Sequence, residues 1–102
     1  MQNELVMAGI FTIDSDLAYV LFDSSASHSF MSMRFVHRHN IPLMAIPFAY
    51  RISTLGAQLC INTRTDIVGL VLATHTYRLQ FMVLPGQGID AILGMNWLRV
   101  LG

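Results

Sequence analysis

The sequence has few charges and a single cysteine, and each scarcity excludes a class of protein. Charged residues make up 12% of the 102 residues, about half the usual share, whereas apolar residues make up 54%. Six basic residues balance six acidic ones, so we see no electrostatic footprint for nucleic acid or an anionic membrane. The lone Cys60 excludes an internal disulfide framework and a cysteine-based zinc site, and it is typical of a reducing compartment.

Long apolar runs and a leader sequence are lacking as well. No basic stretch followed by an apolar one opens the chain, so no signal peptide is expected. The longest apolar runs fall far short of the roughly 20 residues that a membrane-spanning helix needs. No linker, low-complexity segment or charge block divides the chain, and we expect one soluble intracellular domain over residues 1–102. Because so small a domain has little interior, part of its apolar surface is expected to contact a partner subunit.

Short strands separated by turns dominate the expected secondary structure. Apolar and β-branched runs predict strands at 5–13, 17–22, 48–53, 58–62, 66–73 and 77–84, and 89–93 is a further short apolar run. Turn residues stand between them at 14–16, 54–57, 74–75 and 85–88. Helical spacing predicts short helices at 30–39 and 95–101, and two prolines indicate an extended connector at 41–47. The pattern favours an all-β barrel or sandwich.

One stretch joins a buried strand to a carboxylate. The apolar run Tyr19 to Phe22 leads directly into Asp23, and small hydroxyl-bearing residues follow. Burying an ionised Asp costs several kcal/mol unless hydrogen bonds or a second titratable group compensate, and a hydroxyl-rich turn can supply such bonds. Two interpretations stay open on this pattern: Asp23 caps the following turn or helix, or it is a catalytic carboxylate.

Four motifs along the chain, taken together, resemble one family. They are Val20-Leu21-Phe22-Asp23-Ser24-Ser25-Ala26-Ser27-His28-Ser29-Phe30, then Phe35-Val36 with Asn40-Ile41-Pro42-Leu43, then Ser53-Thr54-Leu55-Gly56, and finally Ala91-Ile92-Leu93-Gly94-Met95-Asn96-Trp97-Leu98. In this order the chain resembles a retropepsin, the aspartic protease domain of retroviruses and long-terminal-repeat retrotransposons. The protease of plant Ty3/gypsy-type Gag-Pol polyproteins is the nearest resemblance.

The resemblance implies a small closed all-β barrel with one or two short helices, acting as a homodimer. Each subunit would supply Asp23, and the two carboxylates would share a proton and activate a water against the scissile peptide bond. It implies no cofactor and no metal. The expected substrate is an extended peptide of a retroelement polyprotein, and the expected location is the cytoplasm or the interior of retroelement particles. Nucleic acid and membrane are not expected partners.

The same resemblance assigns roles to the residues around Asp23. Ser24 would bond across the dimer interface, and Ala26 would pack beneath the catalytic pair. A hairpin would form a flap over the substrate, with Ser53, Thr54, Leu55, Gly56 and Ala57 at its tip. The structural signature would be Ile92, Leu93 and Gly94.

Three departures from the family pattern are visible. Ser25 stands where the active-site triplet normally has Gly, whose lack of a side chain suits a tight turn and close approach of the substrate. The chain stops at Gly102, where relatives usually continue with another strand, and Asn96 replaces an Asp that is frequent in the plant relatives. The first two keep a second function open, a catalytically weak or inactive retropepsin-like module for dimerisation or peptide binding. An unrelated small β domain is the third hypothesis.

Other chemistry is less well supported by the residues. The histidines at 28, 37, 39 and 75 lack the spacing of a metal site, and His28 matches a structural residue of the family turn. Asp90 is a second acid beside an apolar signature, so an Asp23–Asp90 pair within one chain is conceivable. We favour a structural hydrogen-bonding role for Asp90, by resemblance. The serines after Asp23 have no nucleophile elbow around them, which argues against a serine hydrolase.

Overall fold

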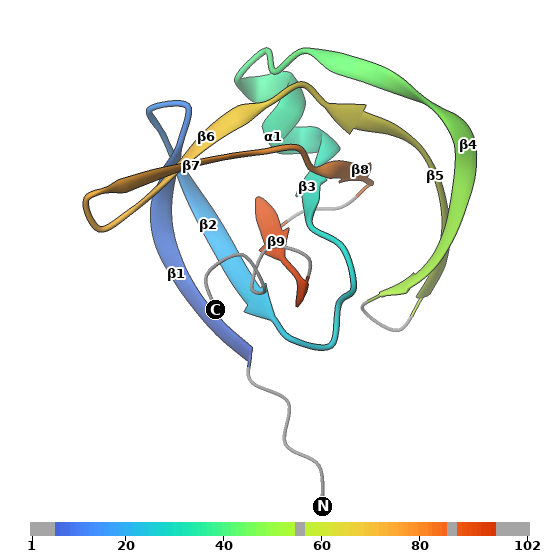
Figure 1. The fold of residues 1–102 in the computed structure, drawn as a ribbon, viewed down its shortest axis with the longest axis horizontal. Coiled ribbons are helices and arrows are strands. Elements are labelled where there is room, and N and C mark those ends of the chain that lie inside the picture. Colours follow the sequence, from blue (N-terminus) through green and yellow to red (C-terminus); the bar gives the residue numbers. More distant parts are fainter. Residues whose placement is uncertain (1–5, 55–56, 86–87, 96–102) are drawn as a thin grey trace, which may run out of the picture.

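A computed structural model describes residues 6–54, 57–85 and 88–95. Its elements are β1 (Val6–Ile13), β2 (Asp16–Asp23), β3 (Phe30–Ser32), α1 (Met33–Arg38), β4 (Leu43–Thr54), β5 (Ala57–Thr65), β6 (Val68–Leu72), β7 (His75–Leu79), β8 (Met82–Leu84) and β9 (Ala91–Leu93). These strands form one sheet in the order β4-β5-β8-β3-β9-β2-β1-β6-β7. Figure 1 shows the sheet curling around, with β4 and β5 opposite β1 and β2. The all-β, barrel-type fold expected from the sequence is confirmed as a curled half-barrel.

The hairpin of β1 and β2 forms as the turn residues predict. Its connection is Asp14-Ser15, and both residues have positive φ, 49° and 73°. This is the backbone of the two-residue hairpin turn whose twist matches that of the flanking strands. The backbone N–H of Gly69 donates to the Asp14 carboxylate at 2.7 Å, which ties the turn to β6. Backbone pairing then runs without interruption from Ile13–Asp16 to Val6–Asp23.

The helix expected over 30–39 is shorter than the sequence indicated. Residues 30–32 form β3, and α1 begins at Met33 because the Ser32 hydroxyl accepts the N–H of Phe35 at 3.1 Å. The helix ends before Asn40, which adopts a left-handed φ of 52°. The prediction was wrong for 30–32, because a fully buried strand and a buried helical turn present similar apolar runs.

The connector expected over 41–47 is also wrong in most of its length. Strand β4 starts at Leu43 and contains Pro47. Pro47 lies where the pairing register with β5 shifts, between Ala45 and Tyr50. Since β4 is an edge strand of the sheet, a residue without an N–H is tolerated there.

The two strands expected over 66–84 are three in the structure. Strand β6 pairs with β7, and the turn between them is Ala73-Thr74, so His75 belongs to β7. The expected strand 77–84 divides into the end of β7 and the separate β8, which pairs with β3 and β5. The helix expected at 95–101 falls outside the described residues from position 96 onward.

Two apolar clusters fill the inside of the curled sheet. The larger contains residues of β1, β2, β6 and α1, among them Val20, Phe35 and Leu70, which are almost fully buried. The smaller connects the β4–β5 hairpin to β3, β8 and β9, and consists of Ala26, Phe30, Ile46, Ile61, Leu84 and Ile92. The second cluster therefore holds the hairpin against the strands next to Asp23.

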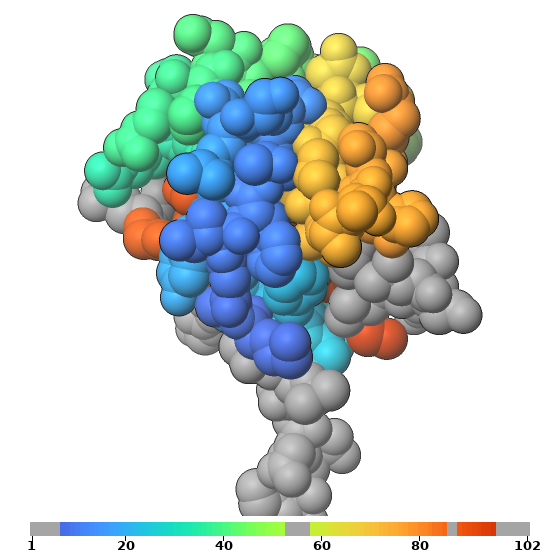
Figure 2. Space-filling view, turned by 90° about the vertical axis from the view of Figure 1, so that its left-hand side faces the viewer, coloured from blue at the N-terminus to red at the C-terminus, as the bar shows by residue number. Residues whose placement is uncertain are grey.

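The β1–β2 hairpin exposes large apolar side chains. Met7, Ile10, Leu17 and Tyr19 are between 44% and 72% exposed. Figure 2 looks onto this side, with β1 in front of the viewer next to the β6–β7 hairpin. Within the described ranges no helix has the length and apolar character needed to cross a membrane.

Candidate active site

Asp23 is the last residue of β2 and its side chain is buried. Its exposed fraction is 7%. Strand β2 lies between β1 and β9 in the sheet, and the fully buried Val20 anchors it from inside. The hydrophobic strand therefore carries a carboxylate into the protein interior at the point where the strand ends.

The carboxylate of Asp23 is held by the turn that follows it. The backbone N–H of Ser25 donates to Asp23 Oδ1 at 2.9 Å, and the Ser25 hydroxyl donates to the same oxygen at 2.6 Å. The Asp23 carbonyl also accepts the N–H of Ala26 at 3.2 Å. An Asp that accepts the N–H two residues later is a common way to fix a turn. These bonds compensate part of the cost of burying the carboxylate.

Ser25 fits this turn without backbone strain. It is exposed, and its φ is not in the left-handed region that favours glycine. The turn itself therefore does not require the Gly that the family pattern has at this position. The side chain of Ser25 contacts its own Asp23 rather than pointing away from it.

The loop of residues 24–29 is fastened to the end of β9 at Gly94. The N–H of Gly94 donates to the Ser29 hydroxyl at 3.1 Å, and the N–H of Met95 donates to the Ala26 carbonyl at 2.7 Å. A Cβ at Gly94 would overlap the carbonyl oxygen of His28 and lie 2.7 Å from that of Ala26. Gly94 is needed because two backbones approach each other closely there. This role of Ser29 was missed from the sequence, because nothing in the sequence distinguishes it from the neighbouring serines.

The signature residues predicted near the C-terminal end lie beside β2. Ile92 and Leu93 are buried in β9, and β9 pairs in parallel with β2, from Val20–Ala91 to Phe22–Leu93. Two apolar strands that each lead into a turn thus lie side by side at the site. Ser24 is half-buried in the turn, and Ala26 is buried in the smaller apolar cluster.

The predicted flap corresponds to the β4–β5 hairpin. Thr54 pairs with Ala57, and Ser53 pairs with Gln58, so the strands of the hairpin reach the expected turn. Leu55 and Gly56 lie outside the described residues. The hairpin contacts the loop after Asp23, because the rings of Tyr50 and His28 have centroids 6.1 Å apart.

The side chain of Asp90 bonds the backbone of β2 and does not pair with Asp23. Its Oδ2 accepts the N–H of Tyr19 at 2.8 Å, and its own N–H donates to the Tyr19 carbonyl at 2.9 Å. The Asp90 carbonyl accepts the N–H of Ser32 at 2.9 Å. Asp90 therefore connects β2, β3 and the start of β9, which is the structural role predicted for it.

The described residues hold no group of three or more His, Cys, Asp or Glu side chains placed to bind a metal ion. His39 pairs with Asp16 at 3.0 Å, and His28 lies within 3.0 Å of the Ser27 hydroxyl. The chemistry available at the site is that of a buried carboxylate beside a β hairpin.

Comparison with known proteins gives the same architecture. The chain is similar to EIAV protease, solved in complex with the inhibitor HBY-793, with a TM-score of 0.72 and 19% identity over 96% of this chain and 89% of that one. It is also similar to the retroviral protease-like domain of Ddi1 from Leishmania major, with a TM-score of 0.67 and 23% identity over 93% and 76% of the two chains. At these identities the two structures establish the fold. A family model described as retroviral aspartyl protease matches residues 1–101. The chain therefore belongs to the retroviral aspartyl protease family.

Proposed function

We propose that this chain is an aspartic endopeptidase in which two copies each supply Asp23. The observation that supports it best is the buried carboxylate of Asp23, fixed at the end of β2 by Ser25 and by a loop fastened to Gly94. Asp90 is engaged by backbone groups of β2, so one chain offers a single carboxylate of this kind among its described residues. A second copy supplies the other.

The proposed reaction needs no covalent intermediate. Two Asp23 carboxylates that face each other hold one proton between them. The ionised one takes a proton from a water, which attacks the carbonyl carbon of the peptide bond. The protonated one donates to the carbonyl oxygen, and proton transfer to the amine nitrogen then accompanies cleavage of the C–N bond.

The proposed substrate is an extended polypeptide lying between Asp23 and the β4–β5 hairpin. An extended chain can pair with strands through its backbone, and the side chains around it then select the sequence. We further propose that the natural substrate is the polyprotein of a retroelement, cleaved inside the cell or inside the element's particles.

A second function rests on Ser25. Its side chain occupies the space beside Asp23 that the usual Gly leaves open, and its hydroxyl already bonds Asp23 Oδ1. This geometry favours an alternative function, in which the dimer binds peptides but cleaves them slowly.

The test is to replace Asp23 by Asn, which keeps the shape and removes the charge. Asp23→Asn should lower kcat on a mixed peptide substrate by about 10²- to 10⁴-fold, the contribution of general acid–base catalysis. Asp90→Asn is the matched control, because its amide oxygen can still accept the Tyr19 N–H. It should keep most of the activity.

Two results would contradict the proposal. Cleavage that persists in Asp23→Asn would exclude Asp23 as the catalytic group, and cleavage lost equally in both variants would favour a pair within one chain. If the parent chain is dimeric and binds a statine-type inhibitor but does not cleave, the binding module is the correct function.

A further inference from the structure

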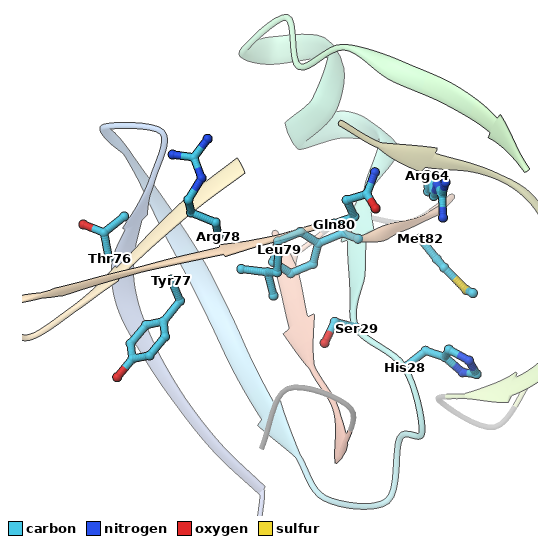
Figure 3. A pocket seen from close by; sticks show the side chains of 10 residues that line it. His28, Ser29, Arg64, Thr76, Tyr77, Arg78, Leu79, Gln80 and Met82 are labelled. Atoms are coloured by element: carbon cyan, nitrogen blue, oxygen red, sulfur yellow. The ribbon is translucent and has the colours of Figure 1, made fainter. Parts of the chain in front are cut away.

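A cavity of about 630 Å³ lies along β7 and β8, and Asp23 is not among the residues that line it. Its volume is within the range of small-molecule and peptide side-chain pockets, about 300–1,000 Å³. Figure 3 shows its lining, with Arg64 of β5 near one end, Arg78 of β7 further along, and Gln80 and Leu79 between them in this view. The lining comes from three parts of the chain: His28 and Ser29, Arg64, and the stretch 76–82.

The charges that line this cavity have one sign. Arg64 and Arg78 line it, whereas the described lining contains no Asp or Glu. Arg64 Nε is buried and has no hydrogen-bond partner. A buried donor left without an acceptor is unfavourable, which favours an acceptor that reaches this guanidinium.

The carboxylates of the described residues are engaged elsewhere. Those of Asp14, Asp16, Asp23, Asp66 and Asp90 bond, respectively, the Gly69 N–H, His39, Ser25, the Ile67 N–H and the Tyr19 N–H. Within residues 6–54, 57–85 and 88–95, neither Arg64 nor Arg78 forms an ion pair with any of them. The complementary negative charge must therefore come from outside this part of the chain.

The remaining lining indicates what carries that charge. The half-buried Leu79 and Met82 give the cavity apolar surface beside its arginines, which suits side chains of a peptide better than a small inorganic anion. His28 and Ser29 belong to the loop that begins at Asp23, and His28 also contacts Tyr50 of the hairpin. The cavity therefore borders the loop that follows Asp23, next to the β4–β5 hairpin.

We propose that the cavity binds acidic side chains of an extended polypeptide, one at Arg64 and a second at Arg78. The guanidinium of arginine presents paired N–H donors that match a carboxylate. The inference rests on the proposed function in taking this polypeptide as the substrate, and it then assigns a preference for Glu or Asp at positions removed from the cleaved bond. The binding itself is independent of cleavage.

The experiment compares two labelled peptides of equal length, an oligoglutamate and an oligoglutamine, binding to the full chain at low salt. Fluorescence anisotropy should show tighter binding of the oligoglutamate, weakening as salt is added. Arg64→Gln and Arg78→Gln should each weaken that binding by about ten-fold, a loss that a charged hydrogen bond of about 1.5 kcal/mol explains. Arg64→Lys, which keeps the charge but not the paired donors, should fall between Arg64→Gln and the parent.

The matched control is Arg34→Gln, which removes the same charge from an exposed position on α1 outside the cavity. It should change the affinity by less than about two-fold, since exposed charges interact weakly at a distance. Equal losses in Arg34→Gln and Arg64→Gln would reduce the effect to net charge and overturn the proposal. Equal affinity for the two peptides would overturn it as well.

A third arm uses inorganic phosphate as competitor. If phosphate displaces oligoglutamate when the two are present at equal concentration, the cavity is a site for small anions. That result would overturn the assignment to a polypeptide. The proposed function fails separately: selective oligoglutamate binding by a chain that cleaves nothing keeps the cavity assignment and removes the protease. Cleavage by a chain that binds both peptides with equal affinity keeps the protease and removes the cavity assignment.

Discussion

Asp23 receives two hydrogen bonds from one neighbour, and both reach the same carboxylate oxygen. The backbone bond from Ser25 is available to any residue at that position, whereas the 2.6 Å bond from its hydroxyl depends on serine. Because the φ of Ser25 is unstrained, the substitution costs the fold little. Its consequence falls on the proposed reaction, because the hydroxyl and Cβ occupy space next to the Asp23 carboxylate.

Replacing Ser25 by Gly should therefore raise catalysis. We expect Ser25→Gly to increase kcat/KM by roughly ten-fold or more, because a hydrogen bond of about 1.5–3 kcal/mol to the charged carboxylate no longer has to be rearranged. Ser25→Ala separates the two causes, since it removes the hydroxyl and keeps the Cβ. Steady-state kinetics at one pH would decide, and a kcat/KM that drops in both variants would mean that the hydroxyl assists the reaction.

The strands and the loop around Asp23 depend on contacts that are remote in sequence. The β1–β2 and β4–β5 hairpins and the strand ending at Asp23 were predictable, because local turn residues and apolar runs determine them. The division of 30–39 into β3 and α1 was not, because pairing with β8 and β9 overrides the helical spacing there. Likewise, no local sequence pattern predicts that the Ser25 hydroxyl bonds Asp23 or that Arg64 Nε is buried without a hydrogen-bond partner.

The contact between Gly94 and the loop after Asp23 gives a prediction for stability. Gly94→Ala should destabilise the fold by about 3 kcal/mol, the upper part of the range for overpacking, because the new Cβ meets backbone oxygens that cannot rotate away. Gly69→Ala is the control: its Cβ would lie 3.3 Å from the end of the Thr76 side chain, and we expect a change below about 1 kcal/mol. Urea unfolding measures both, and equal midpoints would show that the loop moves freely.

The molecule exposes large apolar side chains and has few charged residues to keep separate copies apart. Met7, Ile10, Leu17 and Phe48 are each more than half exposed, and basic and acidic residues balance. Weak charge repulsion between copies and available apolar surface both favour association. The single carboxylate of the Asp23 type in the described residues makes association a requirement of the proposed chemistry.

Mixing parent and inactive chains tests that requirement. If each active dimer needs two Asp23 side chains, a ten-fold excess of Asp23→Asn chains should lower the activity of a fixed amount of parent chain by about ten-fold, because most parent chains then sit in mixed dimers. The same excess of an unrelated protein should leave the rate unchanged. Activity that is insensitive to the Asp23→Asn chains would show that one chain suffices.

The bond from the Gly94 N–H to the Ser29 hydroxyl spans 65 residues of sequence. A contact of such separation forms late, since the intervening chain must first be closed into a loop. During synthesis the ribosome releases the strand ending at Asp23 long before it releases β9, so the nascent polypeptide carries the carboxylate without the support that fixes its loop. For the proposed protease, the site around Asp23 is thereby completed only when β9 has been translated and has docked beside β2.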